Sequence, residues 1–187
     1  MDIAQLSRRV LSSDARLGGV RLVVVDGPAG SGKTTFAARL AAALGAQIVQ
    51  MDDLYEGWSG LDAAVFDRLE KEVLGPLRSG RDGRYRRYDW DAGRFAEWHD
   101  VPVAAALVVE GVGAAARPVD PYAVLRVWVE APSEVRLARG VARDGEHLRE
   151  QWVRWSALED AHFESDGTRD RADLVVDGTT AVPTRIS

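Results

Sequence analysis

The sequence contains no cysteine and only three histidines, and these absences remove several kinds of active site. Without cysteine the chain can form no disulfide, no thiol nucleophile and no cysteine metal site. The histidines stand far apart, at His99, His147 and His162, and their spacing is not that of metal ligands. Thiol and disulfide chemistry is therefore excluded, and a histidine-based metal centre is not indicated.

Long apolar runs and an excess of positive charge are also absent. No run approaches membrane-spanning length, and the first ten residues carry Asp2, Arg8 and Arg9 instead of the apolar core of a signal peptide. The formal net charge of −5 argues against a protein that neutralises the phosphates of a nucleic acid. We therefore expect a cytoplasmic protein with neither a membrane nor a nucleic-acid partner.

Lysine is scarce as well, because Lys33 and Lys71 are the only lysines among 24 basic residues. A composition so rich in arginine lowers the information in any single arginine and raises that in Lys33. This lysine stands in Gly27-Pro28-Ala29-Gly30-Ser31-Gly32-Lys33-Thr34, which fills every position of the pattern G-x-x-x-x-G-K-[ST].

The motif also has the flanking elements that a phosphate-binding loop requires. A valine-rich run over 21–26 precedes it and predicts a buried strand, and an apolar helix over 33–44 follows it. The glycines let backbone N–H groups converge on phosphates, the Lys33 ammonium reaches the β- and γ-phosphates, and the Thr34 hydroxyl ligates Mg²⁺. We predict that ATP and Mg²⁺ are bound here by Gly27, Ala29, Gly30, Ser31, Gly32, Lys33, Thr34 and Thr35.

Strands alternate with helices along the whole chain, which predicts an α/β fold with a parallel sheet. Further strands are expected over 47–51, 104–109, 123–129 and 172–178, and further helices over 2–13, 62–79, 148–158 and from Glu134 onward. We therefore predict one P-loop NTPase domain over 1–187, with three α/β/α layers, an N-terminal helix within 1–19 and a helical lid over about 133–150. The arginine-rich segment 79–87 is interpreted as a loop.

Two carboxylates are expected at the carboxyl ends of strands, where open α/β sheets bind their ligands. Asp52 ends the second strand and is the candidate base for an acceptor hydroxyl. Asp53 is a weaker candidate, because adjacent side chains usually diverge. Glu110 ends an apolar strand, so we expect it to share a metal site with Thr34.

Arginines fall on one face of the helix that begins near Glu134, at positions 136, 139 and 143. We expect Arg139 and Arg143 to contact phosphates as part of a closing lid, although a solvated helix face would show the same pattern. The aromatic residues Tyr88, Trp90, Phe95 and Trp98 either stack on a flat substrate ring or belong to the core, whereas Trp152 and Trp155 are expected in the core.

These residues resemble the uridine kinase-like branch of P-loop kinases, which includes uridine, nicotinamide riboside and pantothenate kinases. The resemblance spans roughly residues 21–178. The family's D-x-F-Y, E-G and Y-D-F elements are similar to Asp52-Asp53-Leu54-Tyr55, Glu110-Gly111 and Tyr88-Asp89-Trp90. Its lid motif R-L-x-R-R-x-x-R-D is similar to residues 136–144, with Gly140 in place of one arginine. Its A-D-x-V-V element near the adenine pocket is similar to residues 172–176.

The resemblance implies that Asp52 is the general base for a ribose 5′-hydroxyl, that Glu110 has a magnesium and catalytic role, and that Tyr88 approaches the acceptor's base. It also places Tyr55 and Arg94 among the substrate-binding residues. The family's pyrimidine-reading histidine has no counterpart after Trp90, and its F-D-H-P element has none beyond Asp62.

The combined interpretation is an ATP- and Mg²⁺-dependent small-molecule kinase that transfers the γ-phosphate to a hydroxyl, with a nucleoside as the expected acceptor. Lys33, Asp52, Glu110, Arg139 and Arg143 are the expected catalytic set. One alternative is a nucleoside monophosphate kinase in which arginines of residues 78–87 hold the acceptor's phosphate. The other is a nucleotide-binding regulatory protein without transfer activity.

Overall fold

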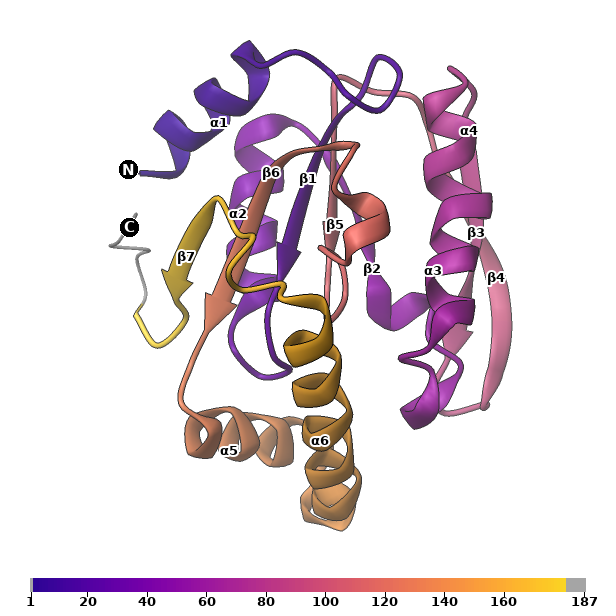
Figure 1. The fold of residues 1–187 in the computed structure, drawn as a ribbon. Coiled ribbons are helices and arrows are strands. Elements are labelled where there is room, and N and C mark those ends of the chain that lie inside the picture. Colours follow the sequence, from indigo (N-terminus) through magenta and orange to yellow (C-terminus); the bar gives the residue numbers. More distant parts are fainter. Residues whose placement is uncertain (1, 181–187) are drawn as a thin grey trace.

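The computed structural model describes residues 2–180 and builds them around a five-stranded parallel sheet (Figure 1). The strands follow the order β2-β5-β1-β6-β7, and all four pairings between neighbours are parallel. All five strands therefore end at the same edge of the sheet, which becomes the ligand side. Their bounds are β1 Arg21–Asp26, β2 Gln47–Gln50, β5 Ala106–Glu110, β6 Ala123–Glu130 and β7 Leu174–Asp177.

Both faces of the sheet are covered, which gives the predicted three layers. The β1 residues Leu22 to Val25 are completely buried, and their side chains alternate between two apolar clusters. Helices α1 (Ile3–Ser12) and α2 (Lys33–Leu44) pack on Val23 and Val25, whereas α3 (Ala63–Leu69) and α4 (Gly75–Arg78) belong to the cluster of Leu22 and Val24. This two-sided burial explains why β1 is an unbroken apolar run.

Two further helices lie at the carboxyl ends of the strands, below the sheet in Figure 1. Helix α5 (Ser133–Asp144) follows β6, and α6 (Arg149–Asp166) leads back toward β7. Trp155 of α6 reaches the apolar cluster on the α3 side of the sheet. Helix α6 therefore connects the core to the ligand side of the sheet. No helix within residues 2–180 combines the length and the apolar character that crossing a membrane requires.

The predicted helix over 62–79 is present, but its middle is widened. Its buried positions Val65, Leu69, Val73 and Leu77 are spaced by four, which overshoots the 3.6-residue period of an α-helix. Between α3 and α4 the chain forms a π-helical turn over Glu70–Leu74. A wider turn of this kind rotates the later residues back toward the core. All four side chains are at most 1% exposed as a result.

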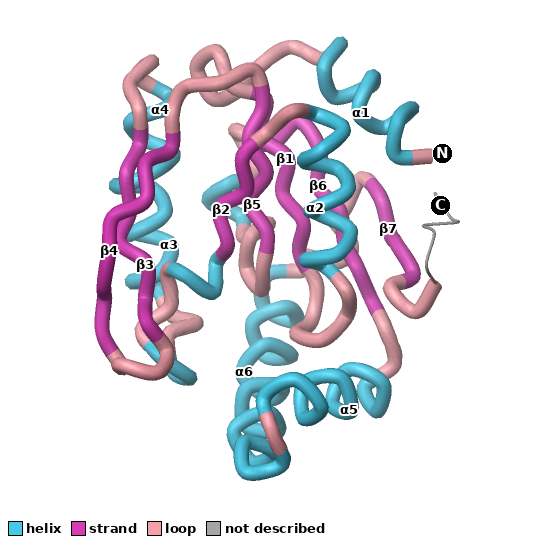
Figure 2. Tube along the Cα trace, turned by 180° about the vertical axis from the view of Figure 1, so that it is seen from behind, coloured by secondary structure: helices cyan, strands magenta, loops and turns pink. Residues whose placement is uncertain are grey.

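The prediction of a loop over 79–87 is wrong. Strand β3 (Gly83–Asp89) pairs antiparallel with β4 (Arg94–Val101) and forms a separate two-stranded hairpin, visible beside α3 and α4 in Figure 2. Gly83 and Tyr85 are buried, whereas the alternating positions Arg84 and Arg86 are exposed. This alternation is typical of a half-buried strand, and the high arginine content of the segment hid it.

Removal of the Leu69 side chain tests the packing around the π-helical turn. Leu69→Ala is expected to lower the free energy of unfolding by about 2–5 kcal/mol, because it opens a cavity in a fully packed core. Asp67→Ala on the same helix removes only an exposed ion pair with Lys71 and is expected to change the free energy of unfolding by less than about 1 kcal/mol. Urea unfolding of both variants measures the difference, and equal losses would contradict the packing described here.

Candidate functional site

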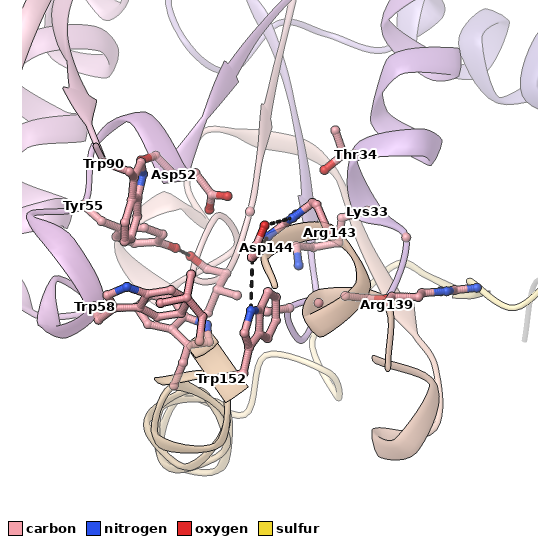
Figure 3. Close-up of a pocket in the computed structure, with 18 of the residues that line it drawn as sticks. Lys33, Thr34, Asp52, Tyr55, Trp58, Trp90, Arg139, Arg143, Asp144 and Trp152 are labelled. Carbon is pink, nitrogen blue, oxygen red and sulfur yellow. Dashed lines mark hydrogen bonds and ion pairs between the residues drawn. The ribbon is translucent and has the colours of Figure 1, made fainter. Parts of the chain in front are cut away.

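A cavity of about 910 Å³ opens beyond the carboxyl ends of β1, β2 and β5 (Figure 3). Its wall is contributed by the phosphate loop, the segments after β2 and β5, the tip of the β3–β4 hairpin, and the α5–α6 pair. Residues predicted from distant parts of the sequence meet here. The lining includes Ala29, Gly30, Gly32, Lys33, Thr34, Thr35, Asp52, Tyr55, Glu110, Arg139 and Arg143.

The phosphate loop is held in shape by its glycines and by Lys33. Gly27, Gly30 and Gly32 have φ values of 137°, 77° and 104°, a region that favours glycine. The nearly buried Lys33 donates from Nζ to the carbonyl of Pro28 at 3.0 Å, across the loop that precedes α2. Gly27 and Ser31 do not line the cavity, so they shape the loop rather than its open surface.

Asp26, the last residue of β1, fastens this loop to the segment that follows Glu110. Its completely buried carboxylate accepts the N–H groups of Gly27 at 2.7 Å, Gly113 at 2.9 Å and Ala115 at 2.8 Å. Burial raises the pKa of Asp26 to about 6, although the hydrogen bonds from the N–H groups and the charge of Lys33 lower it in part. Asp26 was not among the predicted site residues, although a charged side chain that ends a buried valine strand is a signal for one.

Thr34 and Glu110 form the pair of oxygen groups that was predicted for a metal. The Thr34 hydroxyl donates to Oε1 of Glu110 at 3.1 Å, and Glu110 is 5% exposed at the end of β5. Burial raises the pKa of Glu110, and Lys33 opposes the shift. Hydroxyl and carboxylate oxygens beside a phosphate loop suit Mg²⁺, which takes few protein ligands and keeps waters and substrate phosphates.

Asp52 faces the cavity from a short 3₁₀ turn, Met51–Asp53, directly after β2. In Figure 3 its carboxylate points toward the side on which Lys33, Thr34 and Arg143 lie. The side chain is open to the cavity but surrounded by protein, and this desolvation raises its pKa against Lys33 and Arg143. Asp53 turns the other way and accepts the Tyr85 hydroxyl at 3.0 Å.

The three arginines of α5 have three different partners. Arg136 contacts Glu159 of α6 at 2.7 Å, whereas Arg139 donates to the carbonyls of Gly30 and Gly178, both at 3.1 Å. Arg143 forms two hydrogen bonds with its neighbour Asp144, at 2.7 and 3.0 Å. Arg139 and Arg143 line the cavity and Arg136 does not.

Four of the six tryptophans line the side of the cavity beyond Asp52. Trp58 packs edge-to-face against Trp90, Trp152 and Trp155, with ring centroids 5.5, 6.1 and 6.2 Å apart. Trp90, at the hairpin tip, also donates from Nε1 to the backbone carbonyl of Asp52 at 3.0 Å. The predicted core residues Trp152 and Trp155 are indeed almost buried, but they also face this cavity.

A family model described as an AAA domain matches residues 22–163, which contain β1, the phosphate loop, Asp52, Glu110 and α5. The chain belongs to the AAA-domain family. No curated protein matches this AAA domain.

Solved structures show that this AAA domain has the fold of P-loop kinases. A possible uridine kinase from Bacillus stearothermophilus is 19% identical, with a TM-score of 0.65 over 92% of this chain and 96% of that one. A protein from Silicibacter sp. TM1040, described as a fructose transport system kinase, is 22% identical, with a TM-score of 0.64 over 94% and 98%. At such identities the similarity shows the fold alone.

Two predicted substrate residues of the AAA domain do not reach the cavity. Tyr88 is 8% exposed and packs edge-to-face on Trp90 at 5.6 Å, so it supports the wall instead of lining it. Arg94 begins β4 on the exposed side of the hairpin. Tyr55 lines the cavity, but its hydroxyl donates to the carbonyl of Val112. Asp62 caps α3 by accepting the Ala64 N–H at 2.8 Å.

A second cavity of about 400 Å³ lies on the other side of the phosphate loop. Gly32, Thr35 and Arg139 line both cavities, and the ends of β6 and β7 complete the second one. Val176, in the segment that resembles the family's adenine-side element, lies in its wall. The two cavities therefore meet at the start of α2.

Position 140 has no room for a side chain, which explains why Gly140 stands where the resembled lid motif has an arginine. A Cβ at this position would lie 2.5 Å from Cε2 of Trp152, so the indole packs directly on the backbone of α5. Nε1 of the same indole donates to Asp144 at 3.1 Å. Trp152 thus takes the space that a side chain at position 140 would need.

Gly140→Ala tests this contact. Alanine favours a helix over glycine by about 1 kcal/mol, but the methyl group overpacks the indole, which costs about 1–3 kcal/mol. We expect net destabilisation in thermal unfolding, and recovery when Trp152→Leu is added. Gly19→Ala is the control, because nothing lies within 4 Å of its Cβ position. A stabilised Gly140→Ala variant would show that the indole is not tightly packed there.

Proposed function

We propose that this AAA domain is an ATP- and Mg²⁺-dependent small-molecule kinase that phosphorylates a hydroxyl, with a nucleoside as the acceptor. One observation carries the proposal: Asp52 faces the same cavity as Lys33 and the Thr34–Glu110 pair. A base, a phosphate-binding cation and a set of metal ligands within one cavity are what phosphoryl transfer to an alcohol requires.

The donor half consists of the phosphate loop and the groups that follow it. Backbone N–H groups of Gly30–Thr34, together with Lys33, bind the β- and γ-phosphates, and the smaller cavity beside Thr35 and Val176 takes the adenine. Thr34 and Glu110 would hold Mg²⁺, which supplies positive charge to the phosphate oxygens. Arg139 and Arg143 would add cations beside the transferred group once Arg143 leaves Asp144.

Asp52 is the group that acts on the acceptor. Its carboxylate takes the proton from the hydroxyl while the hydroxyl oxygen bonds to the γ-phosphorus and the bond from that phosphorus to the β–γ bridging oxygen breaks. The products are the phosphate ester and ADP. Because burial raises the pKa of Asp52, the carboxylate is a better proton acceptor than a fully solvated aspartate.

The acceptor half favours a compound without its own phosphate. None of the arginines at 78, 81, 84, 86 and 87, all within the described residues, lines the cavity. Arg78 is paired with Glu70, Arg84 with Asp100, and Arg87 with Glu97 and Asp89. The wall beside Asp52 is instead formed by tryptophans, which suit a planar ring. These contacts argue against a nucleoside monophosphate kinase.

A change at Asp52 tests the transfer step separately from nucleotide binding. Asp52→Asn is expected to lower kcat by at least about a hundredfold, since it removes the base, and to leave the affinity for ATP within about twofold. In the wild type, kcat/KM should fall on the acid side with an apparent pKa above the usual aspartate value, because the protonated form is inactive and burial raises that pKa. Full activity of Asp52→Asn would contradict the assignment.

A comparison of acceptors tests the substrate class. ADP release is followed with a panel of nucleosides and their 5′-monophosphates, and we expect turnover with nucleosides only. Trp90→Ala should raise the acceptor KM by about tenfold by removing part of the aromatic wall. The control Trp98→Ala removes a half-exposed tryptophan of the same hairpin outside the cavity and should leave KM unchanged. ATP binding without turnover of any acceptor would favour a regulatory protein.

A further inference from the structure

The Glu159 carboxylate of α6 is completely buried and contacts the phosphate loop from behind, without lining the cavity. Its Oε2 accepts the backbone N–H of Ala29 at 2.8 Å, and its Oε1 accepts Nη1 of Arg136 at 2.7 Å. One side chain therefore joins α6, α5 and the loop. A buried ion pair is costly to desolvate, so this arrangement depends on the good geometry of both contacts.

The contact with Ala29 fixes how the loop presents its backbone. In a phosphate loop, successive N–H groups converge on the bound anion. The N–H of Ala29 donates to Glu159 instead, so this N–H is not available to an anion, although Ala29 itself lines the cavity. The direction of this one peptide determines where the chain from Gly30 onward begins its turn around the phosphates.

Helix α5 holds the same part of the loop from the other side. Nη1 of Arg139 donates to the carbonyl of Gly30 at 3.1 Å. A Cβ on Gly30 would lie 2.6 Å from the carbonyl oxygen of Arg136, so the backbones of the loop and α5 touch. The Arg136–Glu159 pair maintains this contact, because it ties the first turns of α5 to α6.

We propose that Glu159 is a positioning residue for the phosphate loop: it orients the peptide of Ala29 and, through Arg136, keeps α5 and Arg139 against Gly30. It acts through the loop and does not touch the substrate. The inference rests on the proposed function, because the loop must bind the phosphates of a nucleotide. A purely structural ion pair would affect stability without any preference for phosphate ligands.

The test replaces the buried pair and measures phosphate binding directly. Arg136→Met combined with Glu159→Leu substitutes apolar side chains, an exchange that buried ion pairs often tolerate. Calorimetry with inorganic tripolyphosphate, ATP and adenosine should show at least a tenfold loss for the first two, about 1.4 kcal/mol, and no change for adenosine. Glu159→Gln keeps an oxygen for Ala29 but cannot pair with Arg136, so a loss of about threefold is expected.

Asp166→Asn is the matched control, since Asp166 of the same helix also accepts one backbone N–H, from Arg117 at 3.0 Å, and one guanidinium, from Arg171, and lines neither cavity. It should leave tripolyphosphate binding unchanged. Unchanged binding of tripolyphosphate by the double variant would overturn the proposal, whatever the melting temperatures. An equal loss of tripolyphosphate binding in the double variant and in the control would overturn it as well. If the double variant does not fold, unchanged binding in Glu159→Gln overturns it. A wild type that binds neither ATP nor tripolyphosphate would instead refute the proposed function.

Discussion

Gly27 approaches the backbone of β6 so closely that a Cβ would lie 2.1 Å from the carbonyl oxygen of Val129. Two similar approaches surround it, since a Cβ on Gly30 would meet the Arg136 carbonyl at 2.6 Å and one on Gly178 would meet the Ser31 carbonyl at 1.7 Å. The loop is thus packed backbone against backbone on β6, α5 and the turn after β7. The glycines serve this packing as well as phosphate binding, and the positions of α5 and β7 depend on it.

The charges around the loop are arranged about one lysine. Burial raises the pKa of Asp26, Asp52, Glu110 and Glu159, and Lys33 opposes the shift in every case. Four carboxyl groups therefore lie in the field of one nearly buried ammonium group, and Arg136 also lowers the pKa of Glu159, as Arg143 lowers that of Asp52. A divalent cation at Thr34 and Glu110 would add positive charge beside these carboxylates, whereas the phosphates of a nucleotide alone would add negative charge. Nucleotide and metal are therefore expected to bind together more favourably than the nucleotide alone.

The parts of the fold that the sequence predicted well are those with local causes. Buried valines define β1, glycines define the loop, and the strand ends place Asp52 and Glu110 at the ligand edge. The hairpin over 83–101 was missed because the alternating arginines resemble a solvated loop, and because Tyr88 was interpreted as a substrate contact. Glu159 was missed for a different reason: its partners lie 23 and 130 residues away, and nothing in its own helix marks a buried carboxylate.

The same distinction separates the donor half of the site from the acceptor half. The donor half is made mainly of backbone groups in one continuous segment, so a short motif is enough to predict it. In the proposed site the acceptor half is assembled from Trp58 after β2, Trp90 at the hairpin tip and Trp152 in α6, and Trp152 has the space it occupies because α5 carries no side chain at Gly140. The position of each ring depends on packing between distant segments, and such packing leaves no local pattern in a single sequence. Under the proposed function, substrate choice would therefore follow from tertiary packing, whereas the capacity to bind a triphosphate would follow from eight consecutive residues.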